Sequence, residues 1–211
     1  GQIVQKIGKD RKKFRDFSLK LDEATKLSAQ QAYVKVSEGI DFTNKGIIPI
    51  RPIVLGGDDF TAICRGDIAL DYVTEFLYQF EQKTHELLGE TIKDNNVFGS
   101  GGADKLTACA GIAFIKSSYP FYYGYDLADA LCERAKKDAK KDENKKRGLA
   151  LSCLMFHKVQ DSFVTNFDDI VKRELTPTKD VSFEFGPYYI DEEKPKDRWT
   201  INELMNFVQK L

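Results

Sequence analysis

The sequence has few features of a zinc-binding, secreted or membrane-spanning protein. Its four cysteines are far apart and never form a C-x-x-C pair, so we do not expect a zinc site. No apolar run approaches the roughly 20 residues that cross a bilayer. The lysine-rich start of the chain also lacks the apolar block of a signal peptide. We therefore expect a cytoplasmic protein, with no membrane contact, whose thiols are reduced and mostly buried.

An excess of one charge and a histidine-based catalytic pattern are missing as well. The chain carries 32 basic and 33 acidic residues, a balance that argues against general coating of nucleic acid. His85 and His157 are the only histidines, and neither belongs to a recognisable triad pattern. The glycine-rich residues 98–104 lack the G-K-[ST] of a P-loop and are expected to form a loop. RNA as a partner is only weakly indicated, through a lysine-rich stretch after residue 135.

Apolar spacing and turn residues predict an α+β fold. The predicted order is helix, strand, strand, helix, strand, helix and strand, at residues 2–39, 47–55, 60–65, 68–88, 106–115, 127–141 and 148–157. This order is nearly that of a ferredoxin-like β-α-β-β-α-β unit, an antiparallel sheet with helices on one face, but without its first strand. Residues 117–126 are predicted to form an aromatic loop.

The pattern weakens after residue 160. A helix is expected over residues 167–175, an extended aromatic stretch over residues 181–190, and a closing helix over residues 201–211. We therefore predict a palm-like domain at residues 1–159 and a C-terminal extension at residues 160–211 that packs on it.

The tip of the predicted hairpin consists of Gly56, Gly57, Asp58 and Asp59. These four residues have two interpretations. Glycine and aspartate are ordinary turn residues, because glycine accepts positive φ and aspartate bonds its own backbone. Two adjacent carboxylates also repel each other, however, and a divalent cation would relieve that repulsion. Mg²⁺ and Mn²⁺ prefer such hard oxygen ligands. Glycines beside them would let a triphosphate approach the backbone closely.

Three stretches in the same order carry a family resemblance. They are "RPIVLGGDDFTAICRGDIAL", "TACAGIAFIKSSYPFYYGYDLADALCERAKK" and "RGLALSCLMF". Together they resemble the second palm domain of the large polymerase-like subunit of type III CRISPR effector complexes, which act in antiviral defence. GGDEF-type diguanylate cyclases share the palm. This chain has Asp59 where their motif has glutamate, and its "YPFYY" segment is more similar to the CRISPR-type family.

The resemblance implies a metal-dependent nucleotidyltransferase. In that family, the 3′-hydroxyl of one ATP attacks the α-phosphate of another, pyrophosphate leaves, and the products are cyclic oligoadenylates. Asp58 and Asp59 would be catalytic ligands of Mg²⁺ or Mn²⁺, and Gly56 and Gly57 would give the nucleotide access. The family carries lysines after the helix that ends in "ERAKK", so Lys136 and Lys140 are the candidates for triphosphate contact. Other proteins of a larger effector complex would be its partners.

The resemblance also implies a departure at the start of the chain. The family's first strand ends in a third metal-binding aspartate, within a turn whose glycine Gly1 resembles. The sequence is therefore expected either to be trimmed of that strand and carboxylate or to be a remnant that lacks them. Without this third carboxylate, we expect crippled catalysis. The alternatives are a catalytically inactive palm that serves as a structural or partner-binding module, and a GGDEF-like cyclase that takes GTP. The edge exposed by the missing strand would be a liability, so we expect two chains to pair across it, or the sheet to close.

Overall fold

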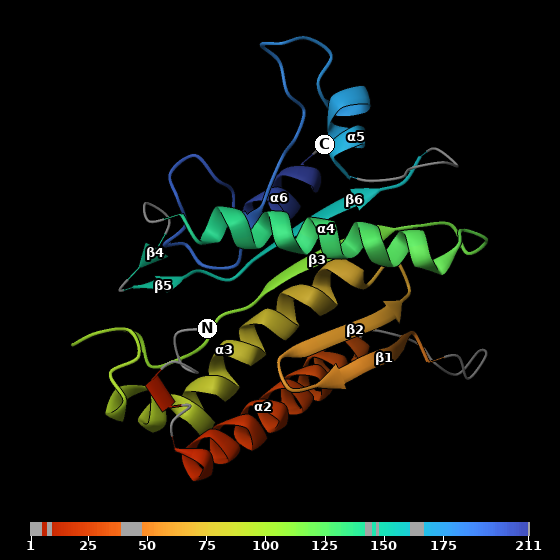
Figure 1. The fold of residues 1–211 in the computed structure, drawn as a ribbon. Coiled ribbons are helices and arrows are strands. Elements are labelled where there is room, and N and C mark those ends of the chain that lie inside the picture. Colours follow the sequence, from red (N-terminus) through yellow and green to blue (C-terminus); the bar gives the residue numbers. More distant parts are fainter. Residues whose placement is uncertain are drawn as a thin grey trace. The chain divides into compact units, whose positions relative to one another are not determined.

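A computed structural model describes residues 6–7, 10–38, 48–141, 145–146, 148–160 and 167–210. Its helices and strands form an α+β fold, as predicted (Figure 1). The chain divides into two compact units. Unit 1 consists of Gly1–Ala108 and Lys145–Ala150, and unit 2 of Cys109–Asn144 and Leu151–Leu211. The boundary at residue 160 between a palm and an extension stays a prediction.

Unit 1 combines two long helices with a β-hairpin. Its main elements are helix α2 (Arg11–Ser37), strands β1 (Ile50–Gly56) and β2 (Asp59–Cys64), and helix α3 (Ala69–Asp94). The two helices lie side by side, with the hairpin along them (Figure 1). A short pair of strands, β4 (Lys145–Lys146) and β5 (Leu149–Ala150), also belongs to this unit. The predicted helix, hairpin and helix are thus all present, while residues 1–5, 8–9 and 39–47 lie outside the described residues.

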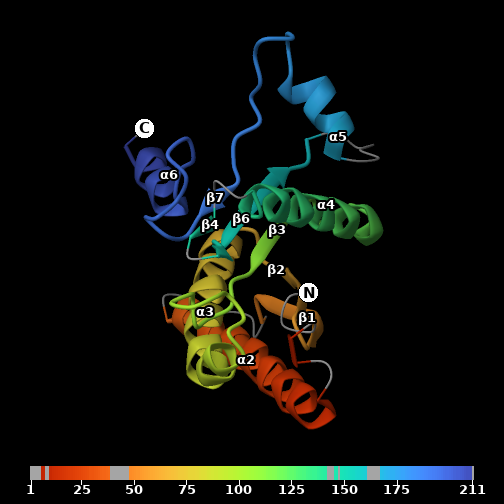
Figure 2. The same cartoon turned by 60° about the vertical axis from the view of Figure 1, so that its left-hand side comes forward.

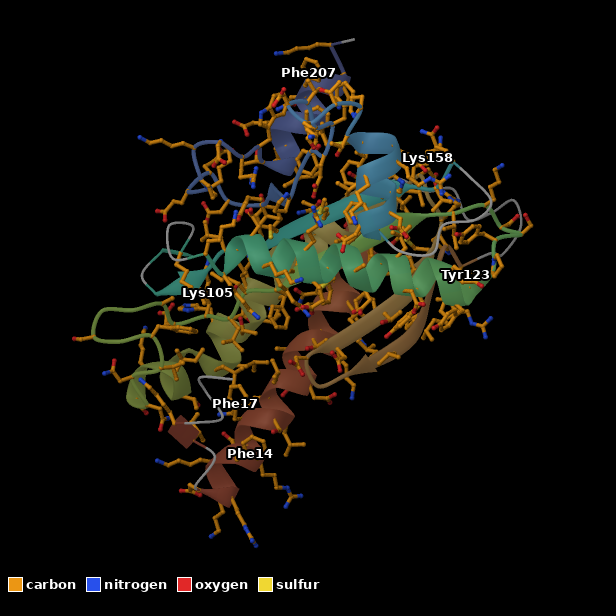
Figure 3. All side chains as sticks on the ribbon, turned by 45° about the horizontal axis from the view of Figure 1, so that its top comes forward. Phe14, Phe17, Lys105, Tyr123, Lys158 and Phe207 are labelled. Carbon is orange, nitrogen blue, oxygen red and sulfur yellow. The ribbon has the colours of Figure 1, made fainter. Side chains whose placement is uncertain are left out.

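Aromatic packing fixes the hairpin on α3. The Phe60 ring lies 4.9 Å from that of Phe76 and 6.1 Å from that of Tyr72, measured between centroids. The Tyr72 hydroxyl in turn donates to the Ala29 carbonyl oxygen of α2 at 3.2 Å. β2, α3 and α2 are therefore linked through one tyrosine. Two phenylalanines of α2 are labelled in Figure 3, and of these Phe17 is buried while Phe14 is exposed.

Unit 2 is built on a crossover between two parallel strands. Strand β3 (Cys109–Phe114) leads into helix α4 (Phe121–Ala139), which returns the chain to strand β6 (Cys153–Lys158). β3 and β6 pair in parallel, and the short β7 (Tyr188–Tyr189) pairs antiparallel with β6. The helix lies along both long strands (Figures 1 and 2). The parallel pair differs from the antiparallel sheet expected above, because a helical crossover brings the chain back to the same end of the sheet.

The rest of unit 2 is short and irregular. Helix α5 (Phe167–Ile170) continues into a π-helical turn (Val171–Leu175), and helix α6 (Ile201–Val208) closes the chain. These agree with the helices predicted at residues 167–175 and 201–211. α6 begins with a capping box, in which the side chains of Thr200 and Glu203 each accept from the other's backbone N–H. Among the helices that the structure describes, none combines the length and apolarity needed to cross a membrane.

The predicted aromatic loop is wrong in its second half. α4 begins at Phe121, six residues before the predicted start, with Pro120 as its N-cap. Aromatic rings four residues apart contact each other across this first turn, Tyr119 with Tyr123 at 6.4 Å and Phe121 with Tyr125 at 6.2 Å. Such i,i+4 contacts support a helix. Tyr123 is labelled near this end of α4 in Figure 3.

Candidate functional site

The candidate site is the tip of the β1–β2 hairpin in unit 1. Gly56 pairs with Asp59, so Gly57 and Asp58 form a two-residue turn. Gly57 has φ of +61°, and Asp58 is not among the residues with positive φ. This is the pattern of a type II′ turn, which places glycine at its first central position. The predicted turn at residues 56–59 is therefore confirmed as a tight hairpin.

Both carboxylates of the tip are accessible. Asp58 lies in the turn and Asp59 is the first residue of β2, and both are exposed. Side chains alternate along a strand, and Phe60 faces α3. Asp59 therefore projects from the opposite face of the hairpin, the same face as Ile63, which is exposed as well. Apart from the adjoining Gly56 and Asp58, a Cβ atom built on Gly57 would have no atom within 4 Å, so the rest of the chain leaves open space on that side of the glycine.

Two polar side chains of α2 hold the turn from the helix side. The Gly57 N–H donates to Asp22 Oδ1 at 3.0 Å. The Thr25 hydroxyl donates to the Gly57 carbonyl oxygen at 2.6 Å. Thr25 is almost fully buried, while Asp22 is partly exposed. Both polar backbone groups of Gly57 are therefore bound to one helix.

Lys26 binds the second carboxylate oxygen of Asp22. Its ammonium group lies 2.7 Å from Asp22 Oδ2, so the two oxygens of Asp22 have different partners. The hydrogen bond from Lys26, followed by the one from the Gly57 N–H, holds the pKa of Asp22 below its ordinary value. Asp22 is consequently ionised at neutral pH, and its charge is compensated locally by Lys26.

The tip offers two oxygen-bearing side chains for a metal ion. Over the described ranges, no group of three or more His, Cys, Asp or Glu residues could hold a metal. Two carboxylates do fit Mg²⁺, because this ion keeps several waters and is commonly bound through one or two carboxylates together with substrate phosphates. The donor set at Asp58 and Asp59 is therefore compatible with a metal–triphosphate complex.

The two candidate lysines belong to the other unit. Lys136 lies in the last turn of α4 and Lys140 is the C-cap of that helix. The Lys136 ammonium is 2.8 Å from Glu133 Oε1, one helical turn away. This hydrogen bond raises the pKa of Lys136. Surface pairs of this kind are weak, so Lys136 could exchange Glu133 for another anion. The described geometry thus brings together Gly56, Gly57, Asp58 and Asp59, and puts the lysines on a separate unit.

Sequence reasoning did not find Asp22 and Thr25. Their signal is modest: they are polar residues three positions apart on a helix whose buried positions include Phe17 and Ala24. Residues at this spacing lie on one helical face. The sequence alone does not say that this face meets the hairpin tip, because that contact joins residues more than thirty positions apart.

All four cysteines are free thiols. Cys153 is fully buried, and the other three are partly buried. Cys109 and Cys153 lie opposite each other on the parallel strands, with their sulfur atoms 3.7 Å apart. The expected burial of these thiols is therefore found in full only for Cys153.

Replacing Gly57 with alanine is expected to lower the free energy of unfolding by about 1–2 kcal/mol, because an L-residue with a side chain is strained at this φ. Chemical denaturation of the whole chain measures the change. Gly56→Ala is the matched control, since Gly56 lacks a positive φ and a Cβ there would meet only Asp22 Oδ1, at 3.6 Å. Equal losses in the two variants would contradict the turn geometry.

A family model described as "Cas10/Cmr2, second palm domain" matches residues 1–145. A search of curated proteins gives no match. The matched segment contains the hairpin tip, both helices that pack against it, and α4 with its two candidate lysines. Since the match covers 145 of the 211 residues, the chain belongs to the family of the Cas10/Cmr2 second palm domain.

Proposed function

We propose that this palm binds ATP together with Mg²⁺ or Mn²⁺ at the hairpin tip, with Asp58 and Asp59 as the metal ligands. The observation that carries the proposal is a tight turn that exposes two adjacent carboxylates beside a glycine whose Cβ side is open. Adjacent carboxylates suit a hard divalent cation. On the side where a Cβ atom would lie, Gly57 would let a phosphate come close without meeting a side chain from elsewhere in the chain.

The chemistry that fits such a site is nucleotidyl transfer. A bound metal would make a ribose 3′-hydroxyl more nucleophilic and would neutralise charge on the phosphates. Asp58 and Asp59 would hold the metal. Lys136 and Lys140, which belong to unit 2, are separately proposed to contact a triphosphate. The 3′-hydroxyl of one ATP would attack the α-phosphate of another, forming a phosphodiester bond and releasing pyrophosphate. A last attack of the same kind within the resulting chain, again with loss of pyrophosphate, would give a cyclic oligonucleotide. We place this activity in a larger CRISPR effector complex of the cytoplasm, whose other subunits would be the protein partners.

Calorimetric titration of ATP, and separately of GTP, in the presence of Mn²⁺ tests the proposal. We expect ATP to bind the parent chain and Asp58→Asn/Asp59→Asn to bind it about 100-fold more weakly or not at all. The reason is that two charged metal ligands are lost together, and each factor of ten corresponds to about 1.4 kcal/mol. Asparagine keeps the size of each side chain, so the turn itself should survive.

The matched control is Asp71→Asn/Asp94→Asn, which removes the same two charges from exposed positions of α3. It should bind ATP as the parent does. If it weakens binding as much as the tip variant, the effect comes from net charge and the site is not at Asp58 and Asp59. Tighter binding of GTP than of ATP would instead favour the GGDEF-like cyclase.

A palm without catalytic activity, acting as a structural or partner-binding module, is the second candidate. It is favoured by the finding that the tip provides only two carboxylates and that, over the part of the chain described, no larger cluster of metal ligands occurs. A parent chain that binds neither nucleotide would support this candidate. Sedimentation would then test self-association, since pairing of two chains, one of the two outcomes expected at the exposed edge, predicts a concentration-dependent mass.

A further inference from the structure

Asp22 and Thr25 bind the one residue whose backbone orients the candidate metal ligands. The Gly57 N–H belongs to the peptide unit that joins it to Gly56, and the Gly57 carbonyl belongs to the peptide unit that joins it to Asp58. Asp22 fixes the first peptide unit and Thr25 fixes the second. Because Asp58 follows directly, the direction of its side chain depends on the second unit.

A hairpin tip needs such support to serve as a metal site. An isolated two-stranded hairpin is marginally stable in water, and metal ligands must be held within about 0.5 Å of their productive positions. Phe60 anchors β2 to α3 next to Asp59. The turn itself reaches α2 through the two contacts at Gly57.

We infer that Asp22 and Thr25 are positioning residues for the metal site at Asp58 and Asp59, acting through their hydrogen bonds to Gly57. The inference rests on the proposed function, because it assumes that the tip binds a metal. Asp22 acts here as a hydrogen-bond acceptor rather than as a ligand, since Oδ1 takes the Gly57 N–H and Oδ2 takes Lys26. The affinity for the metal should therefore depend on the acceptor oxygen and not on the charge of Asp22.

The whole chain, titrated with Mn²⁺ and followed by electron paramagnetic resonance, tests this. Asp22→Ala and Thr25→Val are each expected to weaken Mn²⁺ binding about 10-fold, the lower end of what supporting residues of metal sites contribute. Asp22→Asn and Thr25→Ser keep an acceptor and a hydroxyl, so both should retain most of the affinity. Hydrogen exchange of the Gly57 amide, measured without metal, should become faster in Asp22→Ala and stay slow in Asp22→Asn.

The same helix supplies matched controls. Asp16 pairs with Lys20 at the i,i+4 spacing of Asp22 and Lys26, and no hydrogen bond joins it to the described hairpin. The Ser28 hydroxyl bonds to the Ala24 carbonyl oxygen within α2. Asp16→Ala and Ser28→Ala should therefore leave both the Mn²⁺ affinity and the exchange of the Gly57 amide unchanged.

Different results would contradict the inference alone and the inference together with the proposed function. Unchanged Mn²⁺ affinity in both Asp22→Ala and Thr25→Val would overturn the inference and leave the proposed function intact. Equal losses in Asp22→Ala and Asp22→Asn would overturn it too, because the charge rather than the hydrogen bond would then matter. A parent chain that binds no Mn²⁺ would contradict the proposed function and the inference together, and exchange of the Gly57 amide would then show only whether Asp22 holds the turn.

Discussion

Replacing Gly111 with alanine is expected to lower the free energy of unfolding of unit 2 by about 3 kcal/mol or more, at the upper end of the cost of overpacking a core. Gly111 lies in the middle of β3, where α4 crosses it. A Cβ atom at this position would lie 1.9 Å from the Ala128 carbonyl oxygen and 2.5 Å from the Cys132 nitrogen. Both are backbone atoms of the helix, so a change of side-chain rotamer cannot relieve the clash.

The helix as a whole would have to move away from the sheet. Leu127, Leu131 and Ala135 are buried on α4 and would lose contacts together. Urea denaturation of the Gly111→Ala chain, followed by circular dichroism, measures the loss.

Gly124→Ala is the matched control within unit 2. A Cβ there would lie 2.8 Å from Ile115 Cδ1, the far end of a flexible side chain that can move aside. Alanine also favours a helix more than glycine does. We expect this variant to be within about 0.5 kcal/mol of the parent. A loss at Gly111 as small as that at Gly124 would show that α4 does not approach β3 as closely as described.

Local patterns predicted the first half of the chain well. The periodic apolar residues around Phe17 and Phe76 mark the two long helices, and the glycine–aspartate turn between apolar strands marks the hairpin. These elements depend on neighbouring residues, so they can be read from the sequence. The start of α4 was missed because "PFYYGYD" combines a proline and a glycine with aromatic residues. In the structure, contacts between those aromatic rings support the helix.

Features that depend on contacts between distant residues were harder to predict from the sequence. The parallel pairing of β3 with β6 follows from the helical crossover between them, and an antiparallel sheet was expected instead. The partners of Gly57 could not be predicted because Asp22 and Thr25 meet it only when α2 packs beside the hairpin. The four residues of the tip could be identified from their motif, whereas the two residues of α2 that support the tip could not. Identifying that support requires knowing which helical turn faces the strands.

A second large effect is expected at Asp138, which is buried in the last turn of α4. Its Oδ2 accepts from Arg198 at 2.7 Å and from Lys141 at 3.1 Å, and its Oδ1 accepts from the Tyr189 hydroxyl at 2.8 Å. Tyr189 is itself fully buried. One carboxylate therefore joins α4 to two positions near the C-terminal end of unit 2.

Replacing Asp138 with alanine is expected to lower the free energy of unfolding by about 2–4 kcal/mol. Removing one member of a buried ion pair usually costs about 3–5 kcal/mol, because the other member is left without compensation. Arg198 retains some exposure to water, which reduces the cost. Asp129→Ala, at an exposed position of the same helix, is the control and should change stability by less than about 0.5 kcal/mol.

The pH dependence of stability tests the contribution of the Asp138 carboxylate without a substitution that leaves a cavity. Burial by itself raises the pKa of Asp138, but the hydrogen bonds from Arg198, Tyr189 and Lys141 together outweigh it and hold the pKa below its ordinary value. A carboxyl group with a depressed pKa in the folded state stabilises the protein above its unfolded pKa, and that contribution is lost as pH falls through the folded value. Unfolding measured between pH 7 and pH 2 should therefore show a loss of stability in the parent below about pH 4. Asp138→Asn, which cannot titrate, should show a smaller loss over this range. Parallel curves for the two proteins would mean that Asp138 is not ionised within this network.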